Sequence, residues 1–281
     1  MKRRDIWKPL LAGPVMPVAA QQQASRGVNG LPPLKITGFK VITTNGGRGY
    51  RWIFLKLLTS EPGLYGIGSA GNHYQTMAVI TALEKHLGPW VIGKDPDRIE
   101  DLWQSAHYRT YWRNGPVNNN VISALDMALW DIKGKRANMP VYELLGGKCR
   151  EGAVVYGHAD GRDPQEVADN VRKFQAMGYQ YIRVQMGGYG GKDTQDRKPE
   201  NAPPGAYYDP RAYTRNMLKM LEHVRSTIGE EVELLHDIHE RLQPIDAVQF
   251  AKDVERFKLF FLEDPLAPEH QEWFFRIREQ C

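Results

Sequence analysis

In the first half of the chain, hydrophobic residues recur with two different spacings, one typical of strands and one typical of helices. Between residues 34 and 58 apolar and polar side chains alternate in two runs, with Asn45-Gly46-Gly47 between them. This alternation predicts two strands, and the Asn-Gly pair predicts that they form an antiparallel hairpin. Apolar side chains instead repeat every three or four positions in three later stretches, at residues 74–87, 98–112 and 120–136. We therefore expect helices there, and a small α+β domain over residues 30–150.

After Cys149 the pattern changes to a repeated unit of strand, loop and helix. Short apolar runs predict strands at residues 153–156, 181–185, 232–237 and 259–263. Asp163-Pro164 and Asp209-Pro210 each predict a helix start, because aspartate is a good N-cap and proline suits the first turn. A third helix is predicted over residues 244–257. Strands that alternate with helices in this way indicate a parallel sheet, in either a barrel or a doubly wound fold.

Three polar residues favour the barrel. Arg183, Asp237 and Glu263 each stand at or near the carboxyl end of a different predicted strand, where an eight-stranded barrel places its catalytic groups. Such a barrel needs roughly 250 residues, and residues 151–281 suffice for about half of it. The predicted fold class is therefore an α+β N-terminal domain followed by a partial (β/α)₈ TIM-type barrel, with the first half of the barrel only.

Composition and charge exclude several classes of protein. The 281 residues include 37 basic and 33 acidic side chains, and 42% are hydrophobic, which is typical of a globular protein and excludes disordered and collagen-like chains. The charges are interspersed and form no basic-aromatic stripe, so we expect no nucleic-acid partner. Cys149 and Cys281 are too far apart for a CxxC metal site or a disulfide framework, and both are expected to be free thiols.

Residues 1–27 differ from the rest of the chain. Lys2-Arg3-Arg4 is followed by a mostly apolar stretch that contains a small-residue site at Val18-Ala19-Ala20. These features predict a twin-arginine-like export signal and a periplasmic protein. A disordered extension of a cytoplasmic protein is the alternative, because three prolines interrupt the apolar stretch. No other stretch has the roughly 20 apolar residues of a membrane span.

Two carboxylates form a candidate metal site. Asp237 and Glu263 end adjacent predicted strands, so both are expected to point into one barrel mouth and to share a hard cation such as Mg²⁺. His239 stands two residues beyond Asp237, on the same face of the strand. An acidic residue at a strand end can equally cap the next helix, and Asp264-Pro265 fits that alternative.

Residues 121–147 carry a recognisable family signature. They include Ser123-Ala124-Leu125-Asp126-Met127-Ala128-Leu129-Trp130-Asp131 and end near Leu144-Leu145-Gly146. This stretch closely resembles the signature of the mandelate racemase and muconate lactonizing branch of the enolase superfamily. Five further segments resemble its mannonate dehydratase-like subgroup, which includes proteins labelled starvation-sensing: residues 111–117, 155–158, 181–185, 235–239 and 262–265.

The resemblance implies an N-terminal domain that caps the barrel and a Mg²⁺-dependent dehydration of a sugar acid such as mannonate or gluconate. The proton α to the carboxylate is removed, the β-hydroxyl leaves as water, and a 2-keto-3-deoxy acid forms. In the subgroup the positions matched by Asp237 and Glu263 bind Mg²⁺, and the position of His239 is a catalytic acid/base.

Other positions of the subgroup concern the substrate. Those matched by Asn72, His158 and Arg183 lie at the substrate, and the arginine also tunes a catalytic tyrosine. That tyrosine is expected within residues 186–208, where three candidates stay open: Tyr189, Tyr207 and Tyr208.

Two alternative hypotheses remain. A racemase, epimerase or cycloisomerase of the same superfamily generally uses a lysine base on the second strand, where this sequence has Arg183-Val184-Gln185. A non-catalytic or inactive truncated homologue is the other, because the family's third metal-binding glutamate and a later histidine are expected beyond Cys281. The resemblance also implies a possible homo-oligomer.

Overall fold

The computed structural model describes residues 30–45, 47, 51–71, 74–190, 200–201 and 208–281. The chain forms two compact units, Met1–Glu151 and Gly152–Cys281, and each is considered by itself. The expected export signal, Asn72 and Tyr207 lie outside the described residues.

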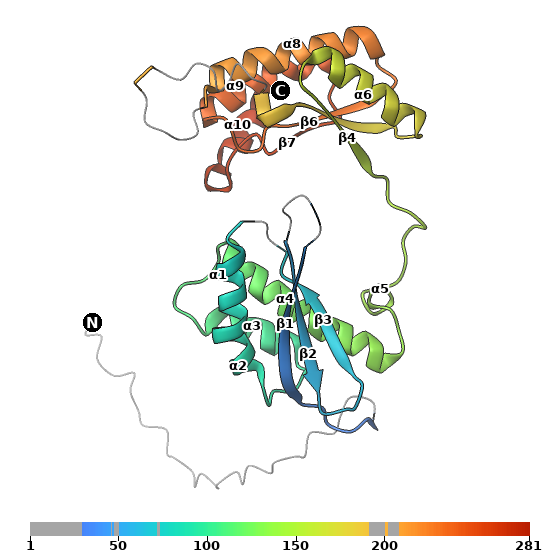
Figure 1. Ribbon diagram of the computed structural model, residues 1–281, viewed down its shortest axis with the longest axis vertical. Coiled ribbons are helices and arrows are strands. Elements are labelled where there is room, and N and C mark those ends of the chain that lie inside the picture. The colour runs from blue at the N-terminus through green and yellow to red at the C-terminus, as the bar shows by residue number, and fades with distance from the viewer. Residues whose placement is uncertain (1–29, 46, 48–50, 72–73, 191–199, 202–207) are drawn as a thin grey trace, which may run out of the picture. The chain divides into compact units, whose positions relative to one another are not determined.

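The N-terminal unit is built on a three-stranded antiparallel sheet of order β1-β2-β3 (Figure 1). Its strands are β1 (Ile36–Asn45), β2 (Arg51–Thr59) and β3 (Tyr65–Ser69). The predicted hairpin between β1 and β2 is confirmed, and β3 extends it by a third strand. The core side chains of the central strand, Ile53, Leu55 and Leu57, are fully buried.

Helices follow this sheet along the chain. They are α1 (Thr76–Thr81), the π-helical turn η2 (Ala82–Leu87), α2 (Gly88–Val91), α3 (Ile99–Tyr108), α4 (Pro116–Ala137) and α5 (Val141–Leu144). The helix predicted over residues 120–136 is confirmed as part of α4. This helix packs closely on β3, since a Cβ atom at Gly66 or Gly68 would lie 1.9 Å from a backbone oxygen of α4. The residues of the family signature in this region therefore have a structural role, because they form the contact between α4 and β3.

The C-terminal unit contains a four-stranded parallel sheet of order β4-β5-β6-β7. The strands are β4 (Tyr156–Gly161), β5 (Tyr181–Met186), β6 (Glu233–Asp237) and β7 (Phe261–Glu263). In the register of the sheet, Arg183 pairs with His158 on one side and with Leu235 on the other, and Asp237 pairs with Glu263. The three later strands match their predicted positions to within two residues.

The position predicted for the first of these strands was wrong. Val154 and Val155 are 76% and 63% exposed and precede the strand, which begins at Tyr156. The reason is the packing of helix α6 (Pro164–Ala176), because a Cβ atom at Gly157 would lie 2.4 Å from the ring of Phe174 in that helix. The start of the strand is therefore set by the small residue Gly157 at this contact, and not by the apolar pair Val154-Val155.

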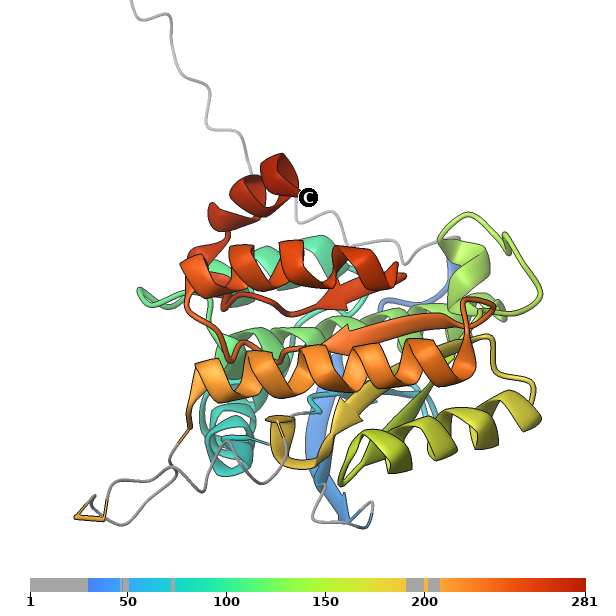
Figure 2. The ribbon, with the colours of Figure 1, turned by 90° about the horizontal axis from the view of Figure 1, so that it is seen from above.

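Three main helices cover one face of this sheet, as Figures 1 and 2 show: α6 (Pro164–Ala176), α8 (Pro210–Ile228) and α9 (Pro244–Val254). Shorter elements are α7 (Gly187–Gly190), η4 (Glu255–Phe257), η5 (Pro268–His270) and α10 (Trp273–Gln280). Both predicted aspartate caps are confirmed, since Asp163 accepts a hydrogen bond from the Glu166 amide and Asp209 accepts from the Arg211 amide. Among the described helices, none is long and apolar enough to cross a bilayer.

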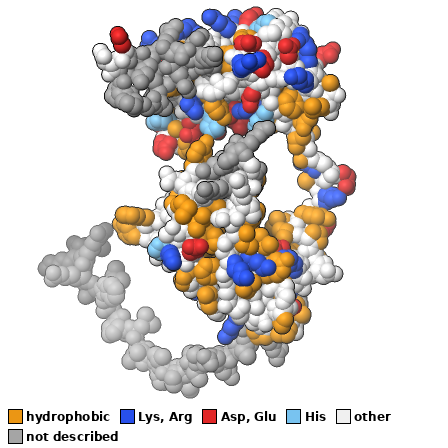
Figure 3. Space-filling view, in the orientation of Figure 1, with side chains coloured by type: hydrophobic (Ala, Val, Ile, Leu, Met, Phe, Trp, Pro, Cys, Tyr) orange, Lys and Arg blue, Asp and Glu red, His pale blue; other side chains and the backbone are white. Residues whose placement is uncertain are grey.

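Side-chain alternation gives the sheet an apolar face and a polar face. Ala159, Ile182 and Leu234 are fully buried beneath the helices. The opposite face carries polar side chains toward the carboxyl ends of the strands: His158, Asp160, Arg183, Gln185, Asp237 and Glu263. In Figure 3, acidic and histidine side chains reach the surface on the lower side of this unit. The fold thus gathers the polar groups at one edge of one face.

Candidate functional site

A buried ion pair stands at the centre of this edge. Arg183 and Asp237 are each 6% exposed. Arg183 Nη1 donates to Asp237 Oδ2 at 2.9 Å, and its Nη2 donates to Asp160 Oδ1 at 3.1 Å. Burial lowers the pKa of Arg183, but the Asp160 and Asp237 carboxylates and Tyr189 outweigh it and raise the pKa above its ordinary value. Arg183 is therefore held as a cation between two carboxylates.

Three carboxylates converge beside this ion pair. Asp237, Glu263 and Asp264 each offer one oxygen, and the three oxygens lie within 4.8 Å of one another. Asp237 Oδ1 is buried and has no hydrogen-bond partner among the described residues. A buried acceptor without a partner costs roughly 1–3 kcal/mol, which a bound cation would offset. Carboxylate oxygens are the ligands that Mg²⁺ prefers, so this donor set fits that ion.

Tyr189 and His239 form a second group at the same edge. The Tyr189 hydroxyl contacts His239 Nδ1 and lies 3.5 Å from Asp237 Oδ2, and it also hydrogen-bonds with Arg183. His239 Nδ1 is itself 3.5 Å from Asp237 Oδ2. Burial raises the pKa of the Tyr189 phenol, and the hydrogen bond from Arg183 opposes that rise.

Backbone conformation brings these two side chains together. Tyr189 has φ +54° and His239 has φ +59°, so both residues lie in the left-handed region that non-glycine residues rarely adopt. Their rings meet edge to face, with centroids 4.5 Å apart. The Arg241 guanidinium lies over the rings of both Tyr189 and Tyr208, but the contact with His239 is made by the Tyr189 hydroxyl. Among the described residues, Tyr189 is therefore the candidate tyrosine that reaches the predicted acid/base.

His158 reaches the carboxylate cluster through a tyrosine that the sequence analysis missed. Tyr156 donates its hydroxyl to Glu263 Oε2 at 3.2 Å, and its ring stacks on His158 with centroids 5.3 Å apart. Burial raises the pKa of Tyr156, and the Glu263 charge raises it further. The sequence could have indicated Tyr156, because it stands two residues before His158 and therefore lies on the same face of the strand.

Asp160 and Gln185 were also missed. Gln185 is 3% exposed, and its Nε2 donates to the backbone oxygen of Asp237 at 2.6 Å while its Oε1 accepts from the Met186 amide. This side chain holds the end of β6 to β5, and Asp160 holds Arg183. Because alternate side chains of a strand point to the same face, the sequence could have placed Gln185 on the polar face together with Arg183.

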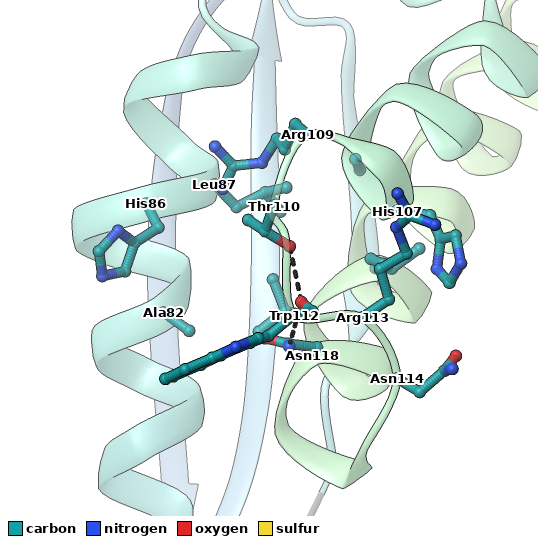
Figure 4. Close-up of a pocket in the computed structure, with 13 residues that line it drawn as sticks. Ala82, His86, Leu87, His107, Arg109, Thr110, Trp112, Arg113, Asn114 and Asn118 are labelled. Atoms are coloured by element: carbon teal, nitrogen blue, oxygen red, sulfur yellow. Dashed lines mark hydrogen bonds between the residues drawn. The ribbon is translucent and has the colours of Figure 1, made fainter.

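Another hollow lies in the N-terminal unit, with a volume of about 240 Å³ (Figure 4). Its wall includes Trp112, whose backbone oxygen accepts from the Thr110 hydroxyl at 2.8 Å, together with the basic side chains of Arg109 and Arg113. The 13 lining residues include no aspartate or glutamate. This hollow therefore offers no carboxylate ligands for a divalent cation.

His236 lies on the other face of the sheet from Asp237 and is fully buried beneath the helices. Its Nδ1 contacts the backbone oxygen of Val184, and its Nε2 contacts the Tyr213 hydroxyl, both at 2.9 Å. Because a carbonyl oxygen only accepts, Nδ1 carries the proton and Nε2 accepts from Tyr213. Burial lowers the pKa of His236 to about 4, so the ring is neutral in the folded chain at neutral pH.

This buried histidine predicts a loss of stability in mild acid. The folded pKa of about 4 lies below the unfolded value of roughly 6.5, so the unfolded chain binds the proton first as the pH falls. The contribution is present above about pH 6.5 and is lost as the pH falls toward 4, by roughly 3 kcal/mol in total. Urea denaturation of the parent and of His236→Gln across this range measures it. Equal slopes against pH in the two proteins would contradict the prediction.

Comparison with known proteins identifies the family. Residues 34–146 match the mandelate racemase / muconate lactonizing enzyme N-terminal domain, and residues 166–281 match the enolase C-terminal domain-like family. The chain belongs to the enolase superfamily. Its fold is accordingly the N-terminal capping domain and the C-terminal barrel domain of that superfamily.

The relatives are dehydratase-like members of this superfamily. The chain is 50% identical over 264 residues to the D-galactonate dehydratase family member RspA of Pantoea ananatis, covering 88% of this chain and 63% of that protein. It is 42% identical over 255 residues to a D-mannonate dehydratase of a Caulobacter species, covering 88% of this chain and 62% of that protein. The chain thus spans less than two thirds of the length of these curated relatives.

A solved structure shows the same fold. An enolase from Pantoea ananatis with bound D-gluconate and Mg superposes with a TM-score of 0.82 at 49% identity, over 88% of this chain and 64% of that one. A putative dehydratase from Zymomonas mobilis superposes with a TM-score of 0.74 at 30% identity, over 88% of this chain and 65% of that one. The expected membership of the enolase superfamily, in its mannonate dehydratase-like part, is confirmed.

Proposed function

We propose that the chain carries metal-binding and proton-transfer groups of a Mg²⁺-dependent sugar-acid dehydratase. The observation that carries this proposal is the convergence of the Asp237 and Glu263 carboxylates with the Tyr189–His239 pair at one edge of the sheet. The names of the relatives support the reaction class, and the gluconate and Mg in the Pantoea structure support the substrate class and the cofactor.

Asp237 and Glu263 would hold the cation. When bound, Mg²⁺ stabilises the negative charge that develops on the sugar-acid carboxylate as the α-proton leaves. Asp237 is well placed for this because Arg183 occupies only its Oδ2 and leaves Oδ1 without a partner among the described residues.

Tyr189 and His239 supply the proton transfers. The phenol proton passes along their hydrogen bond to His239 Nδ1, and the resulting tyrosinate is stabilised by Arg183. The tyrosinate takes the α-proton of the sugar acid, and the imidazolium gives its proton to the leaving β-hydroxyl, which departs as water. Both side chains then return to their starting protonation states, so the cycle balances.

Two further residues complete the proposed substrate site. His158 is exposed on the polar face and stacks on Tyr156, which supports a role for its ring in binding a substrate hydroxyl. Asn72 is proposed as the second substrate contact on the family resemblance. We also propose that β4–β7 are the first four strands of a (β/α)₈ barrel.

The dehydratase is preferred to a racemase for a chemical reason. The second strand of the sheet offers Arg183 and Gln185 on its polar face, and neither is a general base. Arg183 is paired with carboxylates, and the Gln185 amide is engaged with backbone groups on both of its atoms. We therefore assign the proton transfers to the neighbouring pair Tyr189 and His239.

The test is turnover of a panel of hexonic acids, including D-mannonate, D-gluconate and D-galactonate, with Mg²⁺ and with EDTA. We expect a 2-keto-3-deoxy product, trapped with semicarbazide, for at least one acid with Mg²⁺ and none with EDTA. Exchange of the α-proton in D₂O without a trapped product would favour racemisation. Absence of both product and exchange at saturating Mg²⁺ would favour a non-catalytic chain.

A further inference from the structure

We propose that Arg241 is a positioning residue, which fixes Tyr189 for proton transfer by linking its ring to the ring of Tyr208. The proposal rests on the role of Tyr189 in the proposed function and adds a residue that touches neither the metal ligands nor the reacting hydroxyl. Three observations carry it: the contacts of Arg241 with both rings, the unfavourable backbone of Tyr189, and a Tyr208 hydroxyl that has no hydrogen-bond partner among the described residues.

Arg241 contacts two tyrosines that belong to different segments. Its guanidinium carbon lies 5.0 Å from the centroid of the Tyr189 ring and 5.4 Å from the centroid of the Tyr208 ring. A guanidinium within about 6 Å of an aromatic ring is attracted by the negative face of that ring. Tyr189 follows β5 and Tyr208 precedes α8, so one arginine joins the two segments.

The backbone of Arg241 is itself held on both sides. Before it, His239 and Glu240 form a left-handed turn with φ +59° and +60°, and the Glu240 amide donates to the backbone oxygen of Asp264 at 2.9 Å. After it, Leu242 is buried in the core of the C-terminal unit. Arg241 therefore presents its guanidinium from a fixed point.

Tyr189 needs such a contact because its backbone has little support of its own. Glycines stand on both sides of it, and Tyr189 has φ +54°, where a side chain other than glycine is disfavoured. A residue keeps such a conformation only where its surroundings hold it. Arg183 and His239 contact the Tyr189 hydroxyl, whereas Arg241 contacts the face of the ring.

Tyr208 contributes its ring to this link and not its hydroxyl. Its hydroxyl oxygen is buried and has no hydrogen-bond partner among the described residues, which is unfavourable for a polar group. The Tyr208 ring packs beside the fully buried Tyr213, with centroids 6.0 Å apart. We infer that this ring is the anchor against which Arg241 holds Tyr189.

The first test follows Tyr189 without any reaction. 3-Fluorotyrosine at position 189 gives a single ¹⁹F resonance, measured in EDTA and without substrate. Arg241→Met keeps the length of the side chain but removes its charge, and it should move the resonance toward its position in the urea-unfolded chain. Tyr208→Leu removes the anchoring ring and should have the same effect. Tyr208→Phe keeps the ring and should leave the resonance at the position of the parent.

Kinetics on the hexonate that the parent dehydrates give a second readout. A misplacement of about 1 Å can cost roughly 10²-fold, so kcat of Arg241→Met and of Tyr208→Leu should fall about 10- to 100-fold. KM should stay close to that of the parent, because the groups proposed to bind Mg²⁺ and substrate are unchanged. The double variant should lose no more than Arg241→Met alone, because both changes break the same link.

Arg256→Met is the matched control for the loss of a guanidinium over an aromatic ring. Arg256 lies on η4, and its guanidinium carbon is 4.6 Å from the centroid of the Phe257 ring. This variant should keep both the ¹⁹F resonance and the kcat of the parent.

The outcomes separate this proposal from the proposed function. A ¹⁹F resonance at the parent's position in both Arg241→Met and Tyr208→Leu would overturn the role of Arg241, whether or not the chain dehydrates a hexonate. Equal shifts in Tyr208→Phe and Tyr208→Leu would overturn the role of the Tyr208 ring. A parent that converts none of the acids, with shifts in Arg241→Met and Tyr208→Leu only, would overturn the proposed function and support the link to Tyr189.

Discussion

Replacing Arg183 by glutamine is expected to lower the free energy of unfolding of the chain by about 3–5 kcal/mol. The guanidinium is buried and donates to Asp237 and Asp160. Its removal leaves the Asp237 carboxylate buried without its cation, and that desolvated charge costs more than the ion pair itself contributes. Chemical denaturation at neutral pH measures the loss.

Two controls define the mechanism of this loss. Arg162→Gln removes an arginine whose ion pair with Glu166 is at the surface, the arginine side chain being 85% exposed, and should leave the free energy of unfolding close to that of the parent. Combining Arg183→Gln with Asp237→Asn should recover part of the stability, because the unpaired charge is then gone. If the double variant were less stable than Arg183→Gln, the loss would come from packing instead of charge.

Replacing His239 by asparagine is expected to lower kcat for the hexonate that the parent dehydrates by about 10²–10⁴-fold. Asparagine accepts the left-handed backbone that His239 adopts, so the loop is expected to keep its shape. It cannot take the phenol proton of Tyr189 or pass a proton to the leaving hydroxyl. The rise in melting temperature with Mg²⁺ should persist, because His239 is not among the proposed ligands.

The matched control for this change is His223→Gln. His223 lies on α8 and hydrogen-bonds with Gln165 at 3.2 Å, so its loss should leave kcat close to that of the parent. A His239→Asn protein with parent-like kcat and unchanged Mg²⁺ stabilisation would remove His239 from the proton-transfer role and leave the metal assignment intact.

The sequence predicted the parts of the fold that depend on local rules. The caps at Asp163 and Asp209, the hairpin and the long helix α4 follow from residue preferences over a few positions. The start of β4 does not, because the close approach of Phe174 to Gly157 is a contact between elements that hydrophobicity does not report.

The sequence alone predicted which polar residues lie at the ends of the strands. The tertiary structure decided which further residues join them. Arg183, Asp237 and Glu263 could be placed at one edge from strand periodicity, because parallel strands end on the same side of a sheet. The choice of Tyr189 among the described candidate tyrosines and the convergence of Asp264 depend on left-handed turns after two different strands. Such turns are stabilised by hydrogen bonds and packing between segments far apart in the chain, so the local pattern of residues carries too little information to predict them.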